Sequence, residues 1–140
     1  MDSAQAYAKV KAVLAQYELK FEETEPFSGS STASFFWLYP EDEHLSMTID
    51  VKTDGSIRLM LVLSQLMPSV DKESLAVALS GYEDLCDFDE PIWPDPLRLV
   101  GLPLTISGEE MERAFPIFLD FVCDFVDFLA SGALDEYLLA

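Results

Sequence analysis

The sequence is poor in basic side chains, and this shortage excludes several kinds of partner. It has 8 Lys and Arg against 26 Asp and Glu, which gives a formal net charge of −18 at pH 7 and a pI near 4.1. A field of this sign repels nucleic acids and anionic membranes, and it attracts basic proteins. We therefore expect neither a nucleic-acid partner nor a membrane partner.

Cysteine and histidine are rare as well. Cys86 and Cys123 have no metal-binding or redox spacing and sit among apolar neighbours, so we expect buried, reduced thiols in a cytoplasmic protein. The single histidine, His44, stands beside an acidic turn without a motif that supplies a nucleophile, which favours a surface residue over a catalytic base. The N-terminus lacks the pattern of a secretion signal, and acidic residues interrupt the longest apolar run.

Motifs for ions and phosphates are missing. Asp87, Asp89 and Asp95 invite comparison with a calcium-binding loop. Such a loop would require Gly and Glu where Ile92 and Arg98 stand. The six glycines form neither a dinucleotide-binding motif nor a P-loop. We expect no metal site, no cofactor and no catalytic residues, and thus a protein that is not an enzyme.

What the sequence does have is apolar side chains. They make up 50% of the 140 residues, and 12% of the residues are aromatic. This composition excludes intrinsic disorder despite the charge, and the length suits one domain spanning residues 1–140. The sequence therefore predicts a large core beneath a strongly acidic surface.

Helical spacing of apolar residues predicts three helices, at residues 3–17, 70–85 and about 108–129. Ser3 is the expected N-cap of the first helix, and Ser107 with Glu110 has the pattern of a capping box before the last. A polar, acidic loop is expected after the first helix, through Glu22 and Glu23 to a Gly/Ser stretch.

Aromatic and alternating runs predict three consecutive antiparallel strands, at residues 34–39, 45–51 and 57–63. Asp54-Gly55 is a hairpin turn, and the polar half of 45–51 should face water. The acidic stretch 86–96 should form a loop or a short edge hairpin. Another strand should start at residues 97–100, and Pro103 should either limit it to an edge or end it. The fold class is α+β: an antiparallel sheet of a three-strand meander plus one or two further strands, flanked by helices (α-β-β-β-α-β-β-α).

Two groups of apolar residues exceed the needs of a simple core. Met60 and Val62 alternate with the core-facing leucines of their strand, and Trp37 lies in a strand that is aromatic on both faces. Trp37, Met60 and Val62 are therefore the candidate partner-binding residues. The last helix is apolar around most of its circumference, so a dimer or a partner should cover part of it. The candidates there are Phe118, Phe121, Phe125 and Phe128.

The chain resembles the class I chaperones of bacterial type III secretion and related bacterial domains of that fold. The resembling segments are the amphipathic residues 4–17, the meander at 34–65, and LPLTISGEEMERAFPIFLDFVCDFVDFL at 102–129. The resemblance implies a cytoplasmic homodimer that binds an extended segment of an effector along apolar patches and sheet edges, without ATP.

Two functions remain open. The first is a non-enzymatic secretion chaperone that holds a partly unfolded client protein on apolar surface, with the acidity keeping the complex dispersed. The second is an acidic inhibitor of a basic partner, either a toxin immunity protein or a nucleic-acid mimic, for which the charge is the only motive. Salt dependence distinguishes them, because binding through charge falls steeply with salt.

Overall fold

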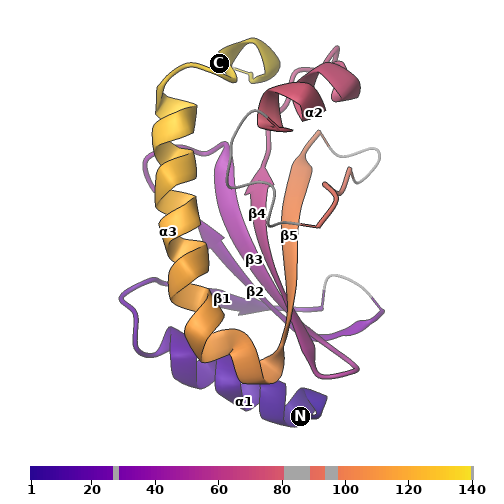
Figure 1. Cartoon of the computed structure of the whole chain (residues 1–140), viewed down its shortest axis with the longest axis vertical. Helices are drawn as coiled ribbons and strands as arrows, with labels where there is room; N and C mark the ends of the chain where they lie inside the picture. Colours follow the sequence, from indigo (N-terminus) through magenta and orange to yellow (C-terminus); the bar gives the residue numbers. More distant parts are fainter. Residues whose placement is uncertain (27–28, 81–88, 94–97, 140) are drawn as a thin grey trace.

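The computed structural model describes residues 1–26, 29–80, 89–93 and 98–139. Its centre is an antiparallel sheet of five strands in the order β1-β2-β3-β4-β5. Helices α1 (Ser3–Leu14) and α3 (Met111–Ala130) pack against this sheet. Helix α2 (Lys72–Ser80) lies at the opposite end of the molecule from α1, beyond the ends of β4 and β5 (Figure 1). The predicted α+β class and element order are confirmed. The end of the predicted helix 70–85 lies outside the described residues, as do Cys86, Asp87 and Asp95.

The strands are β1 (Glu22–Thr24), β2 (Ser31–Leu38), β3 (Leu45–Lys52), β4 (Ser56–Leu63) and β5 (Val100–Ser107). The meander β2–β3–β4 is confirmed, and Gly55 turns the β3–β4 hairpin with a φ of 88°. The expected acidic loop is wrong at Glu22 and Glu23, which pair with Phe36 and Phe35 of β2. Both of these β1 side chains are exposed. The segment therefore lacks the alternation of apolar and polar residues by which a strand is recognised in a sequence.

Pro103 lies in the middle of β5, opposite Met60 of β4. Gly101 exchanges both backbone hydrogen bonds with Ile92, and the Asp89 N–H donates to the Pro103 carbonyl. These residues of β5 therefore turn their polar groups toward 89–92, away from β4. Pro103 removes no donor from the β4–β5 ladder, which is why an edge strand tolerates it.

The main core lies between the sheet and the two helices α1 and α3. Alternate residues of β3 and β4 face it, and α3 contributes Phe118, Phe121 and Phe125, which are 1%, 6% and 0% exposed. Phe128 is half-buried and packs against the same core. A single chain thus covers most of the apolar arc for which the sequence predicted a dimer or a partner.

The opposite face of β3 corrects the sequence prediction. Ser46, Thr48 and Asp50 were expected in water, but they are 5%, 6% and 0% exposed. Asp50 accepts hydrogen bonds from Ser34 Oγ at 2.5 Å and from Arg58 Nη2 at 2.5 Å. Alternation in the sequence reveals two different faces, but it does not show that Asp50 finds its partners on the neighbouring strands and not in water.

The helix ends also differ from the predictions. Asp2, not Ser3, caps α1: its side chain accepts from the Gln5 N–H at 2.8 Å, and the Gln5 side chain accepts from the Asp2 N–H at 3.0 Å. Helix α3 begins after a 3₁₀ turn, and Ser107 Oγ donates to Glu110 Oε1 at 3.0 Å without capping the backbone. None of the helices in the described residues is both long enough and apolar enough to cross a membrane.

Candidate functional site

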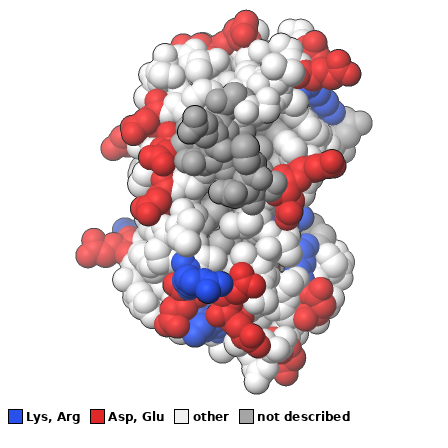
Figure 2. Space-filling model, viewed as in Figure 1, with Lys and Arg blue, Asp and Glu red and all other residues white. Residues whose placement is uncertain are grey.

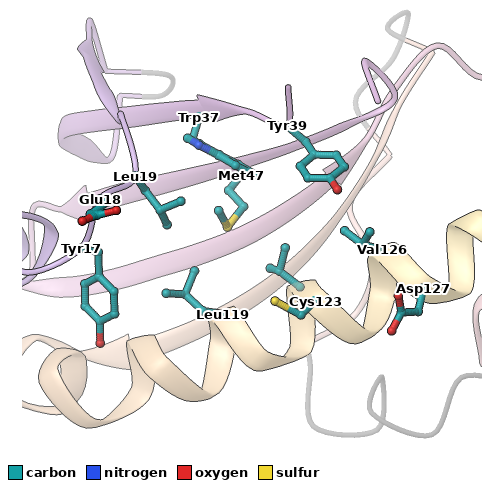
Figure 3. Close-up of a pocket in the computed structure, with 11 residues that line it drawn as sticks. Tyr17, Glu18, Leu19, Trp37, Tyr39, Met47, Leu119, Cys123, Val126 and Asp127 are labelled. Atoms are coloured by element: carbon teal, nitrogen blue, oxygen red, sulfur yellow. The ribbon is translucent and has the colours of Figure 1, made fainter. Parts of the chain in front are cut away.

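Helix α3 presents a second apolar row beside the phenylalanines of the core. Leu119, Val122, Cys123 and Val126 follow one another at spacings of three, one and three residues, so they share one side of the helix. Leu119 and Val126 are half-buried, Val122 is 5% exposed, and Cys123 is exposed. This row faces β2 across a gap (Figure 3).

The facing wall comes from the end of β2 and the residue after it. Trp37 and Tyr39 are two positions apart and share a face, and Trp37 pairs with Met47 of β3. The Trp37 and Tyr39 ring centroids are 5.8 Å apart. Strand β1 pairs with β2 only as far as Phe36, so Trp37 lies past the pairing.

Together these residues line a groove of about 570 Å³ between α3 and β2. Met47, only 1% exposed, lies between the two walls. Tyr17, Glu18 and Leu19, from the connection between α1 and β1, line one end, and Asp127 lines the other (Figure 3). Helix α1 ends at Leu14 and reaches only one end of the sheet, which leaves this stretch uncovered by helix α1.

The lining is almost entirely apolar, and its polar groups are simple. The Tyr39 hydroxyl donates to a Glu41 carboxylate oxygen at 3.1 Å. Burial raises the pKa of Tyr39, and the hydrogen bond to Glu41 raises it further, so the hydroxyl stays neutral at physiological pH. The groove thus offers aromatic and aliphatic contact along its length and carboxylates at its ends.

The structure separates the residues that the sequence singled out. Trp37 lines the groove, whereas Met60 and Val62 lie on the opposite face of the sheet. Val62 is 7% exposed, and a Cβ on Gly101 would lie 2.5 Å from the Met60 sulfur, so Met60 packs directly on that glycine. The four predicted phenylalanines contribute to the core or pack against it, and none lines the groove.

Several groove residues were missed. No sequence motif includes Tyr39, Met47, Leu119 or Val126. These residues come together only because of the way α3 is rotated relative to β2. Cys123 was predicted to be buried, which is wrong: its thiol is exposed and lines the groove. Helix α3 carries a stripe of exposed aspartates at Asp120, Asp124 and Asp127. This stripe was a usable signal, because residues at its margin must border both water and an apolar row.

His44, which directly precedes β3, forms a second, smaller site with the C-terminal segment. Its Nδ1 lies 2.6 Å from Asp42 Oδ1, and its Nε2 lies 2.5 Å from the Leu139 carbonyl oxygen. Leu138 bridges Leu66 at the same place, so the histidine holds the C-terminal segment. Its side chain is 19% exposed, which corrects the prediction of a surface residue.

The environment of His44 favours its charged form. Burial by itself lowers the pKa of His44, but the hydrogen bonds to Asp42 and to the Leu139 carbonyl outweigh it. The charges of Asp42 and Glu43 act in the same direction, so the pKa is raised above its ordinary value.

The groove is therefore the larger of the two sites, and its chemistry is that of contact with an apolar surface. Among the described residues, no group of three His, Cys, Asp or Glu side chains is arranged to hold a metal ion. Comparison with protein-family models, with curated proteins and with solved structures found no match to this chain.

Proposed function

We propose that the chain is a protein-binding module that holds a partly unfolded client protein in the groove between α3 and β2. The observation that carries the proposal is an open apolar groove of about 570 Å³ along the edge of the core, walled largely by half-buried apolar side chains. Exposed apolar surface of this kind is costly in water unless a partner covers it.

The shape of the groove favours a chain segment. The wall from Leu119 to Val126 spans seven helical rises, roughly 10 Å in all. An extended peptide covers that length with about three residues. The aromatic wall at Trp37 and Tyr39 suits one or two large apolar side chains of such a segment.

The resemblance to secretion chaperones supports the same proposal, since it implies a client held in extended form. It also implies a cytoplasmic homodimer. The dimer surface in that proposal cannot be the α3 phenylalanines, because Phe118, Phe121 and Phe125 are buried within one chain. Val77, 71% exposed on α2, is one large apolar side chain that a second copy could cover.

A neutral peptide tests the proposal. The probe has two leucines and one tryptophan at its centre, within a background of Ser, Gly and Asn, and binding is measured by fluorescence anisotropy. We expect the wild type to bind and a Leu119→Asp/Val126→Asp variant to lose binding, because two carboxylates would enter the apolar wall. Ile117→Asp is the matched control and should bind normally, because Ile117 is an apolar residue of the same helix that is 64% exposed and does not line the groove. Equal binding by the groove variant and the wild type would refute the proposal.

One observation favours the acidic inhibitor as a second candidate, namely the net charge of −18. Under that function, a lysine-rich peptide without apolar residues should bind as well as any apolar probe. Its binding should disappear at about 0.5 M salt, where the Debye length is near 4 Å. The groove variant should then bind like the wild type.

A further inference from the structure

The charges around the groove point to the kind of client segment it accepts. Glu18 lines one end and Asp127 the other, and both residues are exposed (Figure 3). Among the described residues, neither carboxylate takes part in an ion pair. Asp120 and Asp124 continue the acidic stripe along the same helix, and both are exposed.

The basic side chains lie elsewhere. In the described part of the chain, four of the eight Lys and Arg side chains form ion pairs: Lys9 with Glu112, Lys11 with Glu23, Arg58 with Asp50, and Arg113 with Glu110. Lys72 is also engaged, lying 5.8 Å from the ring centroid of Trp93. Figure 2 shows Lys and Arg side chains among acidic ones toward the end of the molecule where α1 lies, and further acidic side chains along the margins of that face. None of the basic side chains lines the groove.

The result is an apolar channel with uncompensated carboxylates at both ends. An apolar segment flanked by acidic residues would be repelled there, and a segment flanked by basic residues would gain two ion pairs at the rim. The basic residues of such a segment must stand on either side of its apolar core, because the two carboxylates that line the groove lie at its ends.

We infer that the client segment is a short apolar core of about three extended residues with a Lys or Arg on each side. This inference rests on the proposed function and specifies its partner. Apolar contact supplies the binding surface, and the flanking charges select among apolar segments and set their orientation across the groove.

The test uses three peptides with the same apolar core of two leucines and one tryptophan. They differ in the flanking residues, which are two lysines, two serines or two glutamates on each side. We expect the lysine-flanked peptide to bind about tenfold more tightly than the serine-flanked one, because two exposed ion pairs contribute about threefold each. The glutamate-flanked peptide should bind most weakly.

Two variants of the protein locate the effect. Glu18→Gln/Asp127→Asn should reduce the preference for lysine to about threefold or less while keeping the affinity for the serine-flanked peptide. Glu73→Gln/Glu90→Gln removes the same charge from exposed sites that do not line the groove, and the preference should persist. Persistence of the full preference in the first variant would overturn the inference.

The outcomes separate this inference from the proposed function. If lysine-flanked and serine-flanked peptides bind equally well and the groove variant binds neither, the function stands and the inference fails. If no peptide binds, the proposed function fails and the inference with it. If lysines without an apolar core bind as tightly as lysines with one, charge alone governs binding and the inference is overturned.

Discussion

Asp50 and Arg58 form the most deeply buried ion pair described in the structure. Asp50 is fully buried and the Arg58 side chain is 21% exposed. Removing the guanidinium leaves a buried carboxylate with only Ser34 as a described side-chain partner, which typically costs about 3–5 kcal/mol. We therefore predict that Arg58→Leu lowers the free energy of unfolding by about this amount in urea titrations.

Two further variants control that measurement. Arg113→Leu removes an exposed ion pair with Glu110, whose side chain is 47% exposed, and should cost less than about 1 kcal/mol. Asp50→Leu combined with Arg58→Leu should be more stable than Arg58→Leu alone, because no unpaired charge remains. A double variant less stable than Arg58→Leu would show that the cost lies in packing and not in charge.

His44 gives the stability of the protein a pH dependence of known sign. Its folded pKa is raised above the unfolded value of about 6.5, so proton binding favours the folded chain. This stabilisation is complete below the unfolded pKa and is lost as pH rises through the folded pKa. We therefore predict that His44→Gln lowers the free energy of unfolding more at pH 5.5 than at pH 8.5.

At each pH, the free energy of unfolding of His44→Gln is compared with that of the wild type. The contribution of the many carboxylates that titrate in both proteins cancels in this difference. Hydrogen exchange at Leu139, whose N–H donates to the Gln65 carbonyl at 2.9 Å, reports the same step locally. Protection of this amide should fall at high pH in the wild type, after correction for intrinsic exchange. A cost of His44→Gln that is the same at both pH values would contradict this account.

At the scale of elements, α3 divides into a core row and a groove row. Phe125 is fully buried, so Phe125→Ala should lower the free energy of unfolding by about 3–5 kcal/mol. Leu119 is half-buried in the groove wall, and Leu119→Ala should cost less than half as much while weakening peptide binding. Thermal melts and anisotropy titrations of both variants check the division. Equal destabilisation by the two substitutions would place Leu119 in the core.

The elements themselves were largely predictable from local pattern. Leu45, Met47 and Ile49 alternate with polar residues, and the hairpin at Gly55 follows from the residues that tolerate a positive φ. Strand β1 was not predictable, because Glu22 and Glu23 are exposed and owe their strand conformation to pairing with β2. The burial of Asp50 was hidden for a related reason, since its partners come from two other strands.

The groove was less accessible to sequence reasoning than the fold. Trp37 was singled out for its aromatic setting, but its neighbours Leu119 and Cys123 come from a helix more than eighty residues away. Their contact depends on the angle and rotation of α3 on the sheet, which helical periodicity leaves open. Periodicity correctly showed that α3 is apolar around most of its circumference. It led us to expect that the phenylalanines would contact a partner, but the apolar side chains left partly uncovered are those of the neighbouring row that lines the groove.

At the scale of the whole molecule, self-repulsion opposes folding. A formal charge of −18 on 140 residues destabilises the compact state, and salt screens this repulsion. We predict that the thermal midpoint rises as KCl increases from about 10 mM to about 0.5 M. The exposed ion pairs near α1 weaken over the same range, but they are few and individually weak. A midpoint that falls with salt would mean that those pairs outweigh the net repulsion.

The most direct test of the central claim uses the thiol already present in the groove. Cys123 is exposed and lines the wall that a client segment must cover. In a Cys86→Ser background, the rate of maleimide labelling at Cys123 should fall in proportion to occupancy by the lysine-flanked peptide. A thiol introduced by Ser80→Cys, with Cys123→Ser, should label at the same rate with and without peptide. Unchanged labelling of Cys123 at saturating peptide would show that the segment binds elsewhere.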